Sequence, residues 1–337
     1  MRRILLLAVL LSAPYLLWVY ETRFPLRSLA DPPQLLVVPP GASAESIGQE
    51  LGRLGVARHP ALFRALALLQ GAGGRLRAGE YALEGPLSLR DILDKLVRGD
   101  VVRHELTIPE GKSLPETAAL AAARGVEAKG FWTAARDPLP IHDLDPLASD
   151  LEGYLFPDTY DVPLRPDAGA ALVARMVQRF REVMVPELPR VAARGLTLRQ
   201  VVTLASLVEL ETARSDERSR IAAVFMNRLR RNMPLQSDPT IIYALRNSGS
   251  WDGNIRKKDL ALTSPYNTYV NNGLPPGPIA SPGREALLAV LAPADVEDIY
   301  FVSRNDGTHE FSETLAEHTR AVERYQRRRS SPSGEQG

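Results

Sequence analysis

The 337-residue chain contains no cysteine. Disulfide bonds, thiolate metal ligands and a cysteine nucleophile are therefore excluded. Its five histidines are scattered and show no HExxH or similar spacing, so we expect no metal site. Positive and negative charges nearly cancel to a net charge of +1, which gives no reason to expect a nucleic-acid partner.

A long apolar run without charges, residues 4–20, follows Arg2 and Arg3 at the N-terminus. As a helix it would extend about 26 Å, which is within the range for a single membrane span. The best signal-peptide cleavage sequence, at 28–30, lies well beyond this run, so an uncleaved anchor is favoured over a cleaved signal peptide. We expect a transmembrane anchor over residues 1–21, a short cytoplasmic N-terminus and an exported body.

The rest of the chain predicts an α+β protein. Three prolines indicate a linker over residues 22–34. Residues 35–108 begin with a βααβ pattern that resembles a LysM-like glycan-binding module. Residues 109–328 form a second, mostly helical domain, and a polar tail at 329–337 is expected to be disordered. Within the second domain the patterns predict helices at about 167–185, 197–213, 216–231 and 315–328, and a β-hairpin over 299–312.

A helix that ends in two glutamates is the most informative feature of the sequence. Residues 197–200 predict a capping box, and apolar residues follow from Val201 to Val208 at the spacing of a buried helix face. Glu209 and Glu211 end this apolar helix. An ionised carboxylate in such surroundings is unfavourable by roughly several kcal/mol unless it is paired or takes up a proton.

The two carboxylates point about 200° apart around the helix, so at most one of them faces a given substrate bond. A raised pKa would suit that carboxyl group to act as a general acid near neutral pH. The alternative is that both glutamates are structural and form ion pairs with Arg214, Arg218 or Arg228.

Three polar loops rich in proline and glycine, at 233–240, 264–269 and 273–279, lie between the expected helices. Stiff loops that carry amide, carboxyl and aromatic side chains suit a sugar ligand. Asp238 also precedes Pro239 as a helix N-cap would, so ordinary turns are the alternative. Residues 151–160 are aromatic and turn-rich, which is typical of a cleft wall rather than a core helix. The candidate substrate contacts are Gln236, Asp238, Tyr266, Asn267 and Tyr269.

Several strings occur in order along the chain. They are Ile-Pro-Glu-Gly at 108–111, Glu-Gly-Tyr-Leu-Phe-Pro-Asp-Thr-Tyr at 152–160, Glu-Leu-Glu-Thr at 209–212 and Val-Phe-Met-Asn-Arg-Leu at 224–229. With the apolar N-terminus and the three loops, they resemble the endolytic murein transglycosylases of the YceG-like family over residues 35–327.

The resemblance implies a single-pass inner-membrane enzyme that carries a LysM-like module before a mostly helical, lysozyme-like catalytic domain outside the cytoplasm. Its substrate would be nascent peptidoglycan, cut within the glycan strand in cell-wall assembly, and peptidoglycan synthases are candidate partners. The family's catalytic residue is the second glutamate of the Glu-x-Glu-Thr string, which is Glu211 here. The family commonly has lysine where this chain has Leu210, so a nearby cation is lost while the general-acid assignment stands.

Lytic cleavage needs an acid for the leaving O4 and then a base for the O6 hydroxyl of the same sugar. One glutamate serves both steps because the nucleophile is intramolecular. Glu209 is then expected to pair with an arginine. No cofactor is expected, since none of the five lysines lies in a motif that supports a pyridoxal Schiff base.

Two alternatives remain open at this stage. A hydrolytic muramidase on the same scaffold would use Glu211 with Asp238 as a second carboxylate and would release a reducing sugar. A non-catalytic, anchored peptidoglycan-binding scaffold protein would keep the fold and use the polar loops to bind a partner.

Overall fold

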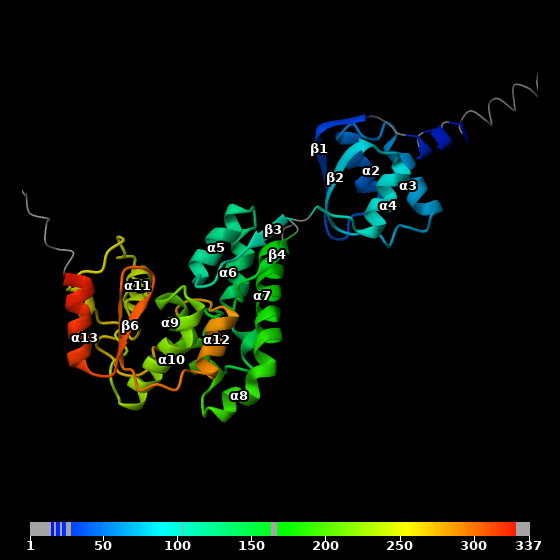
Figure 1. The fold of residues 1–337 in the computed structure, drawn as a ribbon. Helices are drawn as coiled ribbons and strands as arrows, with labels where there is room; N and C mark the ends of the chain where they lie inside the picture. The colour runs from blue at the N-terminus through cyan, green and yellow to red at the C-terminus, as the bar shows by residue number, and fades with distance from the viewer. Residues whose placement is uncertain are drawn as a thin grey trace, which may run out of the picture. The chain divides into compact units, whose positions relative to one another are not determined.

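The computed structural model describes residues 15–16, 18–20, 22–24, 28–102, 104–162 and 167–327. Most of the expected anchor over 1–21 and all of the expected tail at 329–337 lie outside these residues. The chain divides into two compact units, which are described separately (Figure 1). Unit 1 comprises Met1–Glu105 and Asp161–Ala168, and unit 2 comprises Leu106–Tyr160 and Gly169–Gly337.

Unit 1 is a two-stranded antiparallel sheet packed with three helices, and its core consists of apolar side chains from all five elements. In the sheet Leu36 lies opposite Tyr81, and both side chains are fully buried. The first strand begins at Ser28, so it takes up part of the segment expected to be a linker. The elements are β1 (Ser28–Val38), α2 (Ala44–Arg53), α3 (Pro60–Leu69), β2 (Gly79–Pro86) and α4 (Leu89–Arg98).

The order β1, α2, α3, β2 reproduces the expected βααβ pattern. Local signals explain these boundaries. The Ser88 side chain accepts a hydrogen bond from the Asp91 backbone N–H, while the Asp91 carboxylate accepts one from the Ser88 N–H, which completes a capping box at the start of α4. The helix ends at Gly99, whose left-handed backbone terminates it without the strain a larger residue would have.

Unit 2 is mostly helical and also contains a two-stranded sheet of its own. The chain as described is therefore a mixed α+β protein in which helices predominate. The sheet of unit 2 is a hairpin that pairs β5 (Tyr300–Ser303) with β6 (His309–Ser312). A further sheet pairs β3 (His104–Thr107) with β4 (Thr159–Val162), and each of these two strands has residues in both units. The β5–β6 hairpin turns at Asn305 and Gly307, both in the left-handed region, as the sequence predicts.

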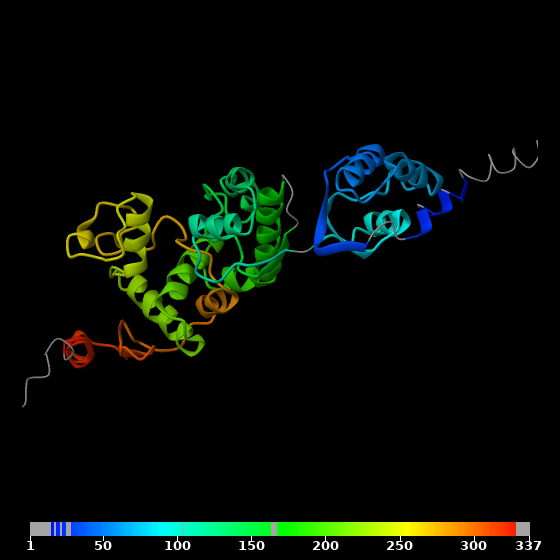
Figure 2. The same ribbon diagram turned by 90° about the horizontal axis from the view of Figure 1, so that it is seen from above.

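Helix α9 lies in the core of unit 2, and its residues from Val201 to Val208 are all buried. Helix α9 packs against α10 and α12, and Figures 1 and 2 show these three together. The α-helices are α5 (Leu114–Ala123), α6 (Ala128–Ala135), α7 (Ala168–Met184), α8 (Leu188–Ala193), α9 (Leu198–Glu211), α10 (Ser215–Arg230), α11 (Asp238–Asn247), α12 (Arg284–Leu291) and α13 (Leu315–Val322). Short 3-10 turns occupy Leu139–Ile141, Val185–Glu187 and Asp259–Ala261, and a π-helical turn, Glu323–Arg327, follows α13.

The segment 151–160 is not a helix, as expected. Its end, from Asp158 to Tyr160, lines a pocket, but the expectation of a cleft wall fails for residues 151–157. Residues 151–157 are buried. The Tyr154 ring meets Phe180 edge-on at 5.2 Å, and its hydroxyl donates to the Asp145 carboxylate at 2.5 Å. Aromatic rings with a bonded polar tip fill a core as well as they line a cleft, so composition alone does not separate the two cases.

Across the described part of the chain, no single helix combines the length and apolar character that crossing a membrane requires. Ala168–Ala193 and Leu198–Glu211 meet those criteria only jointly, as a pair bent by 105°.

Candidate active site around Glu211

Helix α9 positions Glu209 and Glu211. A capping box fixes the start of this helix, and the middle of the helix is buried. The predicted capping box is present: the Gln200 N–H donates to the Thr197 hydroxyl at 3.2 Å, and the Thr197 N–H donates to the Gln200 side chain at 2.9 Å. The helix ends at Glu211, where Thr212 adopts an extended backbone. Both glutamates therefore lie on the last turn of a rigid, buried helix.

The two carboxylates contact different groups, as their angular separation predicts. Glu209 Oε1 accepts a bond from Arg218 at 3.1 Å, and Oε2 accepts the Gly283 backbone N–H at 2.8 Å. The Arg218 side chain is buried and also pairs with Glu110 and Glu285. The expected pairing of Glu209 with an arginine is thus confirmed, and its partner is Arg218.

Glu211 has no such ion pair among the described residues. Its Oε1 accepts a hydrogen bond from the Ser237 hydroxyl at 2.5 Å, and the side chain is largely shielded from solvent. Burial raises the pKa of Glu211 to about 7. The Ser237 bond and the charge of Arg228 oppose this rise in pKa, and the negative charge of Asp238 adds to it. With Oε1 engaged as an acceptor, Oε2 is the oxygen left to carry a transferable proton.

Ser237 is held in place by a second loop. Its backbone N–H donates to the Thr268 hydroxyl at 3.0 Å, and its carbonyl accepts the Thr240 hydroxyl at 2.6 Å. The preceding residue, Gln236, has a left-handed φ of 50° and donates its N–H to the Thr268 carbonyl. Two of the three polar loops identified in the sequence are therefore bonded to each other directly beside Glu211.

Asp238 and Tyr269 lie on this same side of the site. The Tyr269 hydroxyl donates to Asp238 Oδ1 at 2.6 Å. Burial raises the pKa of Tyr269, and the bond to Asp238 and the charges of Asp238 and Glu211 add to this rise. The prediction that Asp238 caps the next helix is wrong, because Ser237 is the N-cap and Asp238 is the first residue of α11. The Asp238 carboxylate is thus free of a capping role and faces Tyr269. Gln236 is exposed beside it.

Tyr266 and Asn267 are placed differently. The Tyr266 ring stacks at a tilt on Tyr243, 4.9 Å away, and the charges that act on its hydroxyl come from Asp150, Arg199 and Glu152. Asn267 is fully buried. Its amide N–H groups donate to the Leu260 and Leu262 carbonyls and its oxygen accepts the Tyr269 N–H. Asn267 therefore shapes the loop from within, which is a structural role in this conformation.

Arg228 connects the site to the hairpin and is a residue whose role the sequence left open. Its guanidinium donates to the Leu235 carbonyl and to the Ile299 carbonyl, both at 2.7 Å. Burial lowers the pKa of Arg228, while the nearby charge of Glu211 raises it. Arg228 therefore fixes the start of the loop that carries Ser237 and places positive charge near Glu211.

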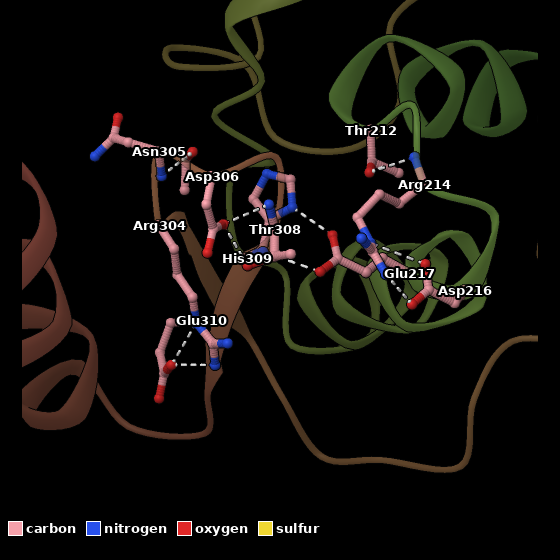
Figure 3. A network of polar contacts seen from close by, with 11 residues as sticks. Thr212, Arg214, Asp216, Glu217, Arg304, Asn305, Asp306, Thr308, His309 and Glu310 are labelled. Carbon is pink, nitrogen blue, oxygen red and sulfur yellow. Dashed lines mark hydrogen bonds and ion pairs between the residues drawn. The ribbon is translucent and has the colours of Figure 1, made fainter.

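Figure 3 shows a polar network that links the hairpin to the start of α10, the helix that follows α9 in the chain. Glu217, in the first turn of α10, accepts the His309 backbone N–H at 2.9 Å and its ring Nδ1 at 2.6 Å. Arg214 pairs with Asp216, and the Arg214 N–H donates to the Thr212 hydroxyl at 3.1 Å. The turn that follows Glu211 is therefore held by side-chain bonds on both sides.

The arrangement suits proton transfer to and from a bound group. One carboxyl group with a pKa near neutrality is oriented by the Ser237 hydroxyl, and Asp238 and Tyr269 lie close enough for their charges and that of Glu211 to interact. Sequence reasoning missed Ser237 and did not separate Arg228 from other arginines. The available signal for Ser237 was its position between two candidate residues in one loop.

Comparisons with known proteins define the class. The YceG-like family model matches residues 36–324. A Bacillus subtilis protein named endolytic murein transglycosylase is 32% identical over 304 residues, covering 86% of this chain and 83% of that protein. A Streptococcus pneumoniae protein of the same name is 30% identical over 339 residues; the match covers 90% of this chain but only 60% of that protein. The crystal structure of a yceG-like protein from Listeria monocytogenes aligns with a TM-score of 0.59 at 28% identity, covering 86% of this chain and 99% of that one.

The family match covers residues 36–324, which include parts of both units. The chain therefore belongs to the YceG-like family, and it is a homologue of proteins named endolytic murein transglycosylases.

Proposed function

We propose that this protein is an endolytic peptidoglycan lytic transglycosylase. It would cleave the β-1,4 bond between N-acetylmuramic acid and N-acetylglucosamine within nascent strands and leave 1,6-anhydro-N-acetylmuramic acid ends. The observation that carries the proposal is Glu211, a shielded carboxyl group with a pKa of about 7, bonded to Ser237 at the end of α9 in a chain homologous to such enzymes.

Glu211 would act twice in this reaction. In the first step it donates its proton to O4 of the leaving N-acetylglucosamine as the C1–O4 bond breaks. The resulting carboxylate then accepts the proton of the O6 hydroxyl as the O6–C1 bond forms within the same sugar, which restores the acid. Ser237 stabilises the carboxylate between these steps by its hydrogen bond to Oε1. We assign sugar contacts to Gln236, Asp238 and Tyr269, and a more distant contact to Tyr266.

The hydrolytic muramidase is the second candidate, because one observation favours it. Asp238 lies close enough to Glu211 for its charge to raise the pKa of Glu211. In an inverting or retaining hydrolase a second carboxylate positions water or forms a glycosyl link. In this site, however, the Asp238 oxygen is already bonded to Tyr269.

Mass analysis of the products from purified sacculi tests the proposal and separates the candidates. The expected ends are 1,6-anhydro sugars, each lighter by one water than a reducing end. Reducing ends would replace the transglycosylase mechanism with the hydrolase. Strong binding to sacculi without any cleavage would favour the non-catalytic scaffold.

We further propose that an N-terminal single-pass helix anchors the enzyme in the plasma membrane with both units outside the cytoplasm. Unit 1, with its βααβ order, would serve as a LysM-like module that binds glycan strands. Peptidoglycan synthases are candidate partners in this location.

A further inference from the structure

A pocket of about 220 Å³ lies directly beside the candidate active site, within unit 2. Leu210 and Pro239 line it, and they are the chain neighbours of Glu211 and Asp238. Neighbouring Cα atoms are about 3.8 Å apart, so the pocket lies close enough to Glu211 and Asp238 for one extended ligand to reach both the pocket and the site.

Four motifs singled out in the sequence converge on this pocket. The Ile-Pro-Glu-Gly string supplies Gly111, the Glu-Leu-Glu-Thr string supplies Leu210, and the two flanking loops supply Pro239 and Ile279. Gly111 has a left-handed φ of 73°, and a Cβ atom at this position would lie 3.2 Å from Leu210 Cδ2. The chain therefore needs a glycine there to approach the end of α9 closely.

The pocket combines apolar walls with a surplus of positive charge. Its charged lining residues are Lys112, Arg246 and Glu116. Both oxygens of Glu116 are engaged, because Oε2 caps α5 at Ser113 and Oε1 accepts a bond from Arg246 at 3.0 Å. Lys112 is half-buried. Against the effect of burial, its charge helps to lower the pKa of Glu116, but among the residues that the structure describes it forms no ion pair within 4.0 Å. A cation held against apolar walls is a recognition element for a ligand carboxylate.

We propose that this pocket is a subsite for the acidic peptide stem that N-acetylmuramic acid carries on its lactyl group, with Lys112 as its carboxylate-binding residue. The inference rests on the proposed function, since it takes murein as the substrate. A stem has the required chemistry: small apolar groups that suit the walls at Leu210 and Ile279, and carboxylates that pair with Lys112. The subsite would make the enzyme prefer peptide-bearing strands over bare glycan.

The test measures binding in a Glu211→Gln background, so that it does not depend on cleavage. Soluble glycan oligomers with their peptide stems, and the same oligomers after amidase removal of the stems, are titrated against the Glu211→Gln protein and against Glu211→Gln/Lys112→Gln. The added Lys112→Gln should weaken binding of stem-bearing oligomers about 10-fold, the loss of one charge-assisted hydrogen bond, and leave stem-free oligomers within about twofold. Glu211→Gln/Lys129→Gln is the matched control, because Lys129 is an exposed lysine on α6 away from the pocket.

The readout is the ratio of the dissociation constants for stem-bearing and stem-free oligomers. If Lys112→Gln leaves this ratio unchanged, either because neither ligand binds more weakly or because both are weakened equally, the subsite is overturned. A circular-dichroism melt that matches the background protein shows that the double variant is folded. Digestion of sacculi by the wild-type protein is scored separately. If the wild-type protein releases no product while the ratio still responds to Lys112→Gln, the proposed reaction fails and the subsite stands.

Discussion

At the scale of single residues, the proposed chemistry depends on the protonation equilibrium of Glu211. Burial favours the neutral form of Glu211, while Ser237 and Arg228 favour the ionised form, and the balance leaves its pKa at about 7. A group that must give up a proton and then accept another works best when neither form is strongly preferred. Ser237 is suited to this because a hydroxyl can donate to the carboxylate and also accept from the acid.

Glu211→Gln should abolish cleavage, because the amide keeps the shape of the side chain but has no transferable proton. We expect a loss of at least about 10² to 10⁴-fold in kcat, the typical range for a general acid, and more because the same group serves both steps. Glu209→Gln is the matched control on the same helix turn and should keep near wild-type activity if folded. Product release from sacculi measures both. An active Glu211→Gln alongside an inert, folded Glu209→Gln would reverse the assignment.

Ser237→Ala and Asp238→Asn should shift the pH dependence of cleavage in opposite directions. The first step needs protonated Glu211, so the rate should fall as the pH rises through the Glu211 pKa. Ser237 lowers that pKa and Asp238 raises it. Ser237→Ala should therefore move the alkaline limb of kcat/KM to higher pH, and Asp238→Asn should move it to lower pH. If the alkaline limbs of the two variants shift in the same direction, the assigned effects of Ser237 and Asp238 on the Glu211 pKa are contradicted, whatever the change in maximal rate.

The stability of Glu211→Gln relative to wild type should also depend on pH. Because the folded-state pKa of about 7 lies above the ordinary glutamate value of 4.5, the folded protein holds a proton that the unfolded chain has lost between these values. Wild-type stability therefore falls as the pH rises from 4.5 through 7. Glu211→Gln removes this penalty, so its advantage should grow from almost nothing at pH 4 to about 3 kcal/mol at pH 8. Urea unfolding of both proteins at several pH values measures it, and a constant difference would contradict a raised pKa.

The sequence could identify Glu211 because a carboxylate on an apolar helix stands out in the local pattern. It could not show whether Asn267 and Tyr266 point into the protein or toward solvent. The orientation of a loop side chain depends on its hydrogen bonds to other segments, such as the bond from Asn267 to the Leu260 carbonyl. The same limit applies to Ser237, which is in contact with Glu211 only because Thr268 and Thr240 hold its backbone.

At the scale of secondary-structure elements, most predictions that rested on local rules are confirmed, and the N-cap predicted at Asp238 is the exception. The capping box at Thr197 and the hairpin over 299–312 each depend on a few adjacent residues, so the sequence contains all the information they need. The burial of residues 151–157 was missed because it depends on packing against distant elements, as Tyr154 does against Phe180.

The hairpin is fastened to α10 by Glu217 and His309, whose side chains are 12% and 11% exposed (Figure 3). His309→Ala would leave the Glu217 carboxylate shielded with only a backbone partner, so it should destabilise the fold by about 1 to 3 kcal/mol. Thermal and urea unfolding measure the loss. Arg231→Gln is the control, because its ion pair with Glu297 is exposed on both sides and should contribute little. Equal effects of the two changes would contradict a stabilising role for the buried pair.

At the scale of the whole molecule, the chain passes between the two units more than once. Asp161–Ala168 belongs to unit 1, although the residues before and after it belong to unit 2. No periodicity marks such a return of the chain, so the sequence divided the protein at one point near residue 108. A single contiguous deletion of the N-terminal module would therefore leave part of unit 1 behind, and binding experiments on the module need the full chain.

The anchor is the remaining feature at this scale, and it follows from the uncharged run at 4–20 behind Arg2 and Arg3. We expect the full-length protein to stay with the membrane fraction after high-salt and carbonate washes, because an apolar helix holds it rather than surface charge. Protease added outside the cytoplasmic membrane should digest both units, whereas an epitope placed before Met1 should survive. Replacing two central residues of the run, Leu10 and Leu11, by arginine should release or mislocalise the protein, since each charge at the centre of a span costs about 2.5 to 3.5 kcal/mol. A mature protein whose N-terminal sequence begins near Asp31 would instead show that the run is a cleaved signal peptide, and the enzyme would then reach its substrate without an anchor.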